Sequence, residues 1–175
     1  MVTPAQPAAA LPPDSLSDPA ELLSAFLDYY RSVLLRKLDG LTEQELRSSR
    51  VPSGWTPLEL VRHLAYVELR WLRWGFEGQD VAEPWGDDDD DGRWHVPDGQ
   101  SAADVRDFFL AQCENSRRIV AAAQLSDIAR GGGRFDAQDP PPALSWILFH
   151  VLQEYARHVG QLDVVRELID GSVGE

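Results

Sequence analysis

Apolar side chains recur three and four positions apart in four separate stretches of this chain, and polar or irregular segments lie between them. Residues at this spacing share one face of an α-helix, so the pattern predicts four amphipathic helices. They cover residues from about 19 to 40, 57 to 77, 102 to 124 and 143 to 170. No segment alternates apolar and polar residues over a useful length, which argues against β-strands.

Capping residues mark where these helices begin and end. Asp18 and Thr56 are good N-cap residues, and each is followed by proline at the first helical position. Ser101 is the N-cap residue of the third stretch, followed by Ala102 and with Asp104 three residues on. Gly40 is a good C-cap for the first helix, and Thr42 begins a second capping motif that predicts a short helical turn.

Four long amphipathic helices predict an all-α fold, a four-helix bundle with long crossover connections. We expect residues 18–171 to form a single domain and the Pro- and Ala-rich residues 1–17 to form a mobile N-terminal arm. The segment at residues 78–100 and the one that follows the third helix are long connections. Such crossover connections allow neighbouring helices to run parallel, so a simple up-down-up-down order is not required.

Charge and composition exclude several classes of function. Acidic residues outnumber basic ones by 29 to 16, and the net charge is −13. Binding to nucleic acid or to an anionic membrane needs clustered positive charge, so we expect neither partner. No apolar run approaches the roughly 20 residues of a membrane span, and the N-terminus lacks the basic and apolar regions of a signal peptide. We therefore expect a cytoplasmic protein.

The single cysteine, Cys113, excludes an internal disulfide and a zinc site built from several cysteines. It falls within a predicted helix, where a small packing residue is the favoured interpretation and a reactive thiol the alternative. The chain also has six tryptophans, and a broad tryptophan-rich helix face is compatible with a homodimer.

The strongest chemical signal is the series His150, Glu154 and His158, spaced four residues apart in the last predicted helix. Side chains at this spacing have Cβ atoms roughly 5–6 Å apart, so two of them can bind one metal ion. Glu154 and His158 flank the apolar stripe and point toward the bundle seam, whereas His150 is rotated toward solvent. His63, at the edge of an apolar face in the second helix, is the best third ligand. The alternative is that these histidines are hydrogen-bonded packing residues.

Two sequence blocks carry a resemblance to a known family. GWTPLELVRHL at residues 54–64 and EYARHVGQLD at residues 154–163 resemble the DinB-like metal-binding bundles. The chain is most similar to the actinobacterial branch related to mycothiol-dependent maleylpyruvate isomerase and mycothiol S-transferases, over about residues 20–171. The resemblance implies that His63, Glu154 and His158 bind a divalent metal, most often zinc or nickel. Many relatives have histidine in place of Glu154, whereas the isomerase branch has glutamate.

The resemblance also implies an activity. A small-molecule thiol such as mycothiol would coordinate the metal as thiolate and attack a small electrophile, in an S-transferase or isomerase reaction. A divalent cation can support this chemistry because it lowers the pKa of a bound thiol or water. Two other functions remain open: a non-catalytic metal-binding stress-response protein, and a metal-dependent hydrolase that uses bound water.

Two acidic features stay open on sequence alone. Glu68 projects near the middle of an apolar helix face, where it can orient a ligand histidine or pair with an arginine. The acidic run at residues 87–91 partly matches a calcium-binding EF-hand loop but lacks its final bidentate glutamate. A solvated acidic loop is the better interpretation, and Trp94 beside it suggests a lid over the pocket.

Overall fold

The computed structural model describes residues 10–174 and is built from helices around one core. In chain order the elements are α1 (Pro19–Leu38), α2 (Glu43–Leu46), α3 (Pro57–Glu68), the π-helix η1 (Leu69–Phe76), α4 (Ala102–Ala121), the short 3₁₀-helix η2 (Gly133–Phe135) and α5 (Leu144–Asp170). The described residues contain no strand beyond two isolated β-bridges, so the predicted all-α fold is confirmed. Most of the predicted N-terminal arm, residues 1–9, lies outside the described residues.

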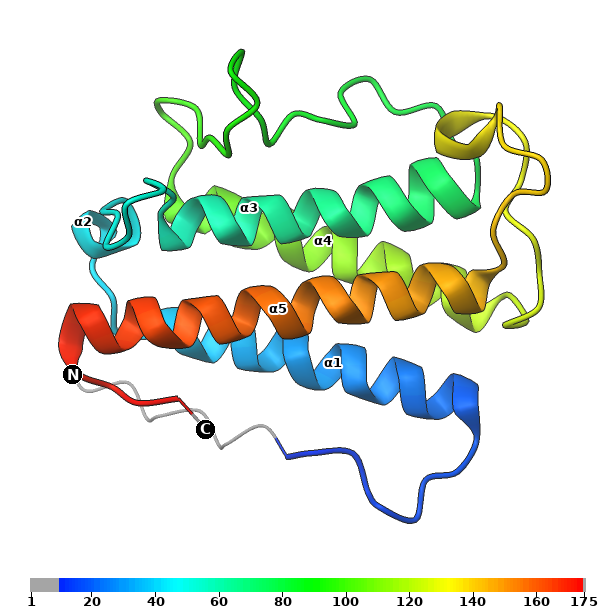
Figure 1. Cartoon of the computed structure of the whole chain (residues 1–175), viewed down its shortest axis with the longest axis horizontal. Helices are drawn as coiled ribbons and strands as arrows, with labels where there is room; N and C mark the ends of the chain where they lie inside the picture. The colour runs from blue at the N-terminus through cyan, green and yellow to red at the C-terminus, as the bar shows by residue number, and fades with distance from the viewer. Residues whose placement is uncertain (1–9, 175) are drawn as a thin grey trace.

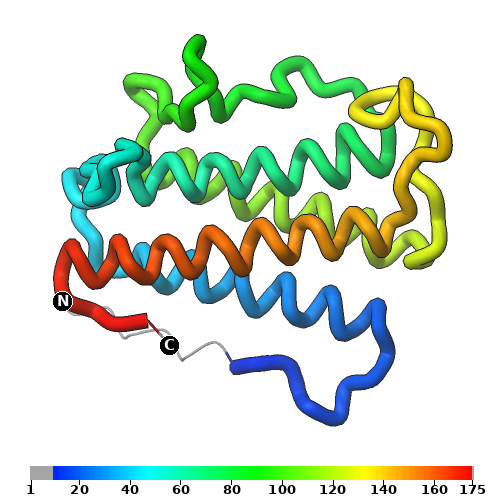
Figure 2. Tube along the Cα trace, viewed as in Figure 1, coloured from blue at the N-terminus to red at the C-terminus, as the bar shows by residue number. Residues whose placement is uncertain are grey.

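The four long helices pack as two parallel pairs, as Figure 1 shows. The most extensive contacts join α3 to α4 and α1 to α5. The connection between η1 and α4 runs back along the length of the bundle, which makes α3 and α4 parallel (Figure 2). The connection between α4 and α5 stays at one end of the bundle. One crossover therefore sets the topology, and it is the segment that contains the acidic run.

Local signals explain why the helices start where they do. Thr42, Thr56 and Ser101 each accept a hydrogen bond from the backbone N–H three residues later, and the carboxylate at that position accepts one from the backbone N–H of the cap residue. These reciprocal bonds satisfy N–H groups that a helix start leaves unpaired. α5 ends at Gly171, whose φ of 78° is left-handed, a conformation that glycine adopts without steric cost.

The second long helix differs from its prediction in one respect. The pattern predicted one continuous α-helix to residue 77, whereas the backbone widens to a π-helix over Leu69–Phe76. Such widened turns are rare. They change the direction of the side chains that follow, and here Trp71 and Arg70 lie within the widened segment.

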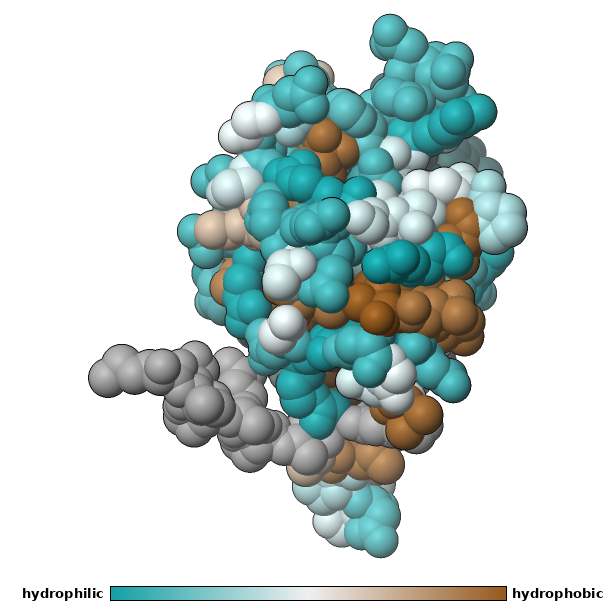
Figure 3. Space-filling model, turned by 90° about the vertical axis from the view of Figure 1, so that its left-hand side faces the viewer, coloured by the Kyte–Doolittle hydropathy of each residue, from teal (hydrophilic) through white to brown (hydrophobic). Residues whose placement is uncertain are grey.

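The surface leaves the homodimer prediction open. Most of the face in Figure 3 is hydrophilic, and a patch of hydrophobic residues interrupts it. Four large apolar residues of α5 are exposed, namely Trp146, Phe149, Val164 and Leu168. Among the described residues, no helix combines the length and the apolar character that crossing a bilayer requires.

Candidate metal centre

The structure brings the three predicted ligands together from two helices. One ligand atom each from His63 on α3 and from Glu154 and His158 on α5 lie within 4.8 Å of one another. His158 is buried and the other two are partly buried. No other group of three or more His, Cys, Asp or Glu residues in the described part of the chain meets this criterion. The cluster sits between facing helices, where bundles commonly build metal sites.

The two nitrogens of His63 have different surroundings. Nδ1 lies 2.9 Å from Oδ2 of Asp87, which can accept a hydrogen bond from it. Nε2 is buried and has no hydrogen-bond partner. Burial, the largest influence, lowers the pKa of His63, and Asp87 offsets part of that effect. A neutral ring with its proton on Nδ1 therefore leaves a lone pair on Nε2, the form that binds a metal ion.

Asp87 is held in place from two sides. Its side chain is only 1% exposed, and it forms an ion pair with Arg70 as well as the bond to His63. Burial alone raises the pKa of Asp87, but the hydrogen bonds from His63 and Arg70 outweigh it, so the net pKa is lowered. Asp87 thus stays ionised and orients the ring of His63.

This role of Asp87 was missed by the sequence reasoning, which placed it in a solvated loop or a calcium site. The loop has no periodicity that would indicate which of its acids turns inward. The buried carboxylate of Asp87 contacts His63 and Arg70, so it does not point toward a calcium ion bound by the other acids of the loop. Asp89 instead accepts hydrogen bonds from the backbone of Asp91 and Arg93. The calcium hypothesis therefore loses its first ligand.

The same loop covers the cluster with an aromatic ring. Trp94 stacks on His63 with ring centroids 4.1 Å apart, and meets His158 edge-on at 5.0 Å. Arg62 ties the loop to α3 by donating to the carbonyls of Gly86 and His95. This agrees with the hypothesis that the loop acts as a lid.

Glu154 lies between two histidines. Its Oε2 is 3.1 Å from Nε2 of His158, and its Oε1 is 3.2 Å from Nε2 of His150. The hydrogen bond with His158 is the main reason why the pKa of Glu154 is lowered. His150 stays outside the three-residue cluster and instead stacks on Trp146, with ring planes 10° apart.

Glu68 does not contact the cluster. It is fully buried, and Arg31 binds both of its oxygens at 2.8 and 2.9 Å. The Tyr155 hydroxyl donates to the same carboxylate at 2.7 Å. Of the two interpretations of Glu68, the structure therefore supports the buried acid paired with an arginine. The orienting carboxylate is Asp87.

Cys113 belongs to this buried network. Its Sγ lies 3.9 Å from Glu68 and 3.8 Å from the Tyr155 hydroxyl. Burial, followed by the nearby Glu68 charge, raises the pKa of Cys113 to about 12. A thiol with such a pKa is almost entirely protonated at neutral pH and is a poor nucleophile, which supports a packing role.

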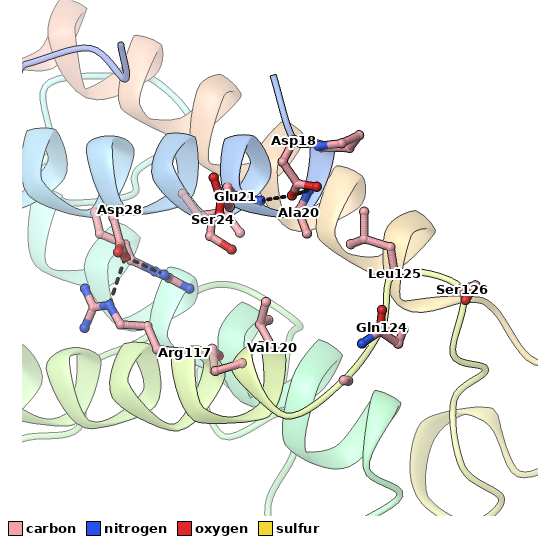
Figure 4. Close-up of a pocket in the computed structure, with 16 residues that line it drawn as sticks. Asp18, Ala20, Glu21, Ser24, Asp28, Arg117, Val120, Gln124, Leu125 and Ser126 are labelled. Atoms are coloured by element: carbon pink, nitrogen blue, oxygen red, sulfur yellow. Dashed lines mark hydrogen bonds and ion pairs between the residues drawn. The ribbon is translucent and has the colours of Figure 1, made fainter. Parts of the chain in front are cut away.

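A large cavity lies away from the cluster. It has a volume of about 710 Å³ between the start of α1 and the end of α4. Figure 4 shows its two walls, with the Asp28 carboxylate 2.9 Å from Arg117. None of the three clustered residues lines it. This cavity is therefore separate from the cluster of His63, Glu154 and His158.

Comparison with known proteins supplies the family. The sequence model of the mycothiol S-transferases matches residues 22–171. The chain belongs to the mycothiol S-transferase family. This confirms the predicted DinB-like resemblance, and the matched region of this family member contains the whole cluster and Asp87. No curated protein sequence matches the chain.

A solved structure shows the same fold. The crystal structure of a conserved protein from Enterococcus faecalis aligns with a TM-score of 0.64, at 18% sequence identity. The alignment covers 90% of this chain and 100% of that one. At this identity the similarity concerns the fold alone, and it supports the DinB-like bundle described above.

Proposed function

We propose that this member of the mycothiol S-transferase family binds a divalent cation through His63, Glu154 and His158 and transfers a thiol, mycothiol, to small electrophiles. The observation that carries the proposal is the convergence of three ligand atoms within 4.8 Å. The buried Nε2 of His63, which has no hydrogen-bond partner, supports the proposal. Burying an acceptor without a partner costs folding free energy, and a bound cation would offset that cost.

The geometry at His158 also favours a cation. Its Nδ1 lies 2.8 Å from the Gln161 side-chain oxygen, which can accept a hydrogen bond from it. With the proton on Nδ1, the Nε2 lone pair faces the Glu154 carboxylate at 3.1 Å. Two acceptors face each other unless a proton or a metal ion lies between them. Two imidazoles and a carboxylate suit zinc or nickel and leave coordination positions open.

The residues of the chain have distinct tasks in this proposal. A bound divalent cation supplies Lewis acidity that lowers the pKa of a coordinated thiol. Asp87 holds the proton on Nδ1 of His63 and thereby keeps Nε2 available. Trp94 covers the two histidine rings and limits water on that side. In the transfer a carbon–sulfur bond forms, the leaving group departs with its electron pair, and the thiol proton passes to solvent.

The test compares His63→Ala with His95→Ala in protein purified without a histidine tag. His95 is a histidine outside the cluster and is exposed, so it serves as the matched control. We expect wild type and His95→Ala to hold stoichiometric metal and to consume a chlorobimane only when a thiol is present. His63→Ala should lose both properties while keeping its helical circular dichroism.

Three results would contradict the proposal in different ways. Wild-type protein that holds no metal, even after zinc or nickel is added, removes its premise. Turnover that continues without thiol indicates the metal-dependent hydrolase. Stoichiometric metal without turnover of any electrophile in the presence of mycothiol indicates the non-catalytic metal-binding protein.

A further inference from the structure

Arg134 is a cation without an acidic partner. Its guanidinium carbon lies 4.3 Å from the ring centroid of Trp71 and 5.3 Å from that of Trp85. Among the described residues, Arg134 takes part in no hydrogen bond and no ion pair with an acid. The lack of a partner is unusual in this chain, because its 29 acidic side chains outnumber its 16 basic ones. The five N–H donors of this guanidinium thus remain available to a ligand.

The charged groups near Arg134 do not include a carboxylate that is paired with it. Arg70 is the neighbouring charge that acts on it, and burial together with Arg70 lowers the pKa of Arg134. Asp136 follows closely in the chain, but its carboxylate accepts from the backbone of Gly132 at 2.8 Å. No carboxylate in the described part of the chain therefore neutralises Arg134, which leaves it able to bind an anion.

Arg134 lines a cavity with aromatic walls. The cavity has a volume of about 620 Å³, and Trp71, Phe135 and Trp146 line it together with Arg134 and three consecutive prolines. This volume lies within the range of small-molecule sites, roughly 300–1,000 Å³. Trp146 is 55% exposed, so its indole face is accessible at the rim. Flat apolar walls with one cation suit a planar ligand that carries a negative charge.

A short chain of contacts leads from this cavity to the metal cluster. The ring centroids of Trp71 and His150 are 4.0 Å apart. His150 in turn lies 3.2 Å from Glu154, one of the three clustered ligands. The cavity and the cluster are thus neighbours along α5, separated by the side chain of His150.

We propose that the pocket formed by Arg134, Trp71 and Trp146 binds the electrophilic substrate, and that this substrate is a planar molecule with a carboxylate group. Arg134 pairs with the carboxylate through two parallel hydrogen bonds, and the exposed indole ring of Trp146 stacks on the planar body. The role of this pocket as a substrate site rests on the proposed function. Binding of a planar carboxylate to the pocket can be measured without any thiol transfer.

The probes are 4-chloro-3-nitrobenzoate and its neutral analogue 4-chloro-3-nitrobenzamide. Both are planar and accept a thiol at the carbon that bears chlorine. The carbon–sulfur bond forms, the carbon–chlorine bond breaks, chloride leaves with the electron pair, and the thiol proton goes to solvent. No oxidant or reductant is needed. The two probes differ chiefly in the charge that Arg134 would recognise.

Affinity is measured by isothermal titration calorimetry on the metal-loaded protein without thiol. We expect the benzoate to bind roughly 10–100-fold more tightly than the benzamide, as charge-assisted hydrogen bonds imply. Arg134→Gln should abolish this preference and leave benzamide binding unchanged, while Arg134→Lys should retain part of it. Arg130→Gln is the matched control, because Arg130 is exposed in the same connection and does not line the pocket.

Two outcomes would overturn the inference. Equal affinities of the wild type for both probes would exclude recognition of the carboxylate. A benzoate preference that survives in Arg134→Gln would place the recognition elsewhere. The variant His63→Ala separates this inference from the proposed function: it should keep the preference for benzoate while losing thiol transfer. If the wild type binds benzoate preferentially but transfers no thiol, the pocket stands and the proposed function fails.

Discussion

The bond between Asp87 and His63 provides the sharpest test of how this site is built. Asp87→Asn keeps the size of the side chain and removes its charge. His63 then loses a charged acceptor for Nδ1, and Arg70 loses the carboxylate with which it forms an ion pair. The Asp87 side chain is 1% exposed, so water has little access to replace the lost interaction.

The expected loss can be bounded from known cases. Removing the carboxylate that orients a metal-binding histidine typically weakens metal binding by about 10–100-fold, or roughly 1.4–2.7 kcal/mol. The upper part of this range applies here, because both oxygens of Asp87 act as acceptors, one for His63 and Arg70 and the other for Arg70. The asparagine amide has only one acceptor oxygen, so its N–H₂ group must face one of these two donors. Arg70 keeps a bond to the Pro84 carbonyl at 3.3 Å, which limits the loss of fold stability.

Zinc affinity is measured by competition with a chromophoric chelator, at a temperature where circular dichroism shows each variant fully folded. Asp90→Asn is the control, because it removes the same charge from an exposed position of the same loop. We expect its zinc affinity to match that of the wild type. If folded Asp87→Asn binds zinc as tightly as Asp90→Asn does, Asp87 does not orient His63 and the reasoning is refuted.

Three further predictions concern the buried network and the loop. Glu68→Ala leaves the buried Arg31 without its main partner and should lower the free energy of unfolding in urea by roughly 3–5 kcal/mol; a loss below about 1 kcal/mol would contradict this. Cys113, with its pKa raised to about 12, should resist iodoacetamide at mildly alkaline pH until urea unfolds the protein, and prompt labelling of the native state would argue against its burial. Gly86→Ala would place a Cβ against the Tyr66 hydroxyl and should destabilise the protein by about 1–3 kcal/mol in thermal unfolding. Adding Tyr66→Phe should restore part of that loss, and no effect of the alanine would mean that the loop is not held against α3.

Much of the fold could be predicted from local sequence. Helix periodicity and capping depend on residues within one or two turns of each other, so Thr56 and Ser101 identified helix starts correctly. The same local spacing placed Glu154 and His158 on one face of α5. His63 was paired with them from its position on an apolar face and from the family resemblance, and the structure brings the three together.

The remaining parts of the site depend on contacts between distant segments. Asp87 lies in a connection without periodicity, so nothing in its neighbourhood showed that it would turn inward to His63 while Asp89 stayed on the surface. Arg31 could not be recognised as the partner of Glu68 either, because α1 packs mainly against α5 and the two side chains meet only in the core of the assembled bundle. Local patterns encode the direction of each side chain along its own helix. Which buried charges meet is decided by packing, since an ionised group taken out of water needs a partner that only the folded chain can supply.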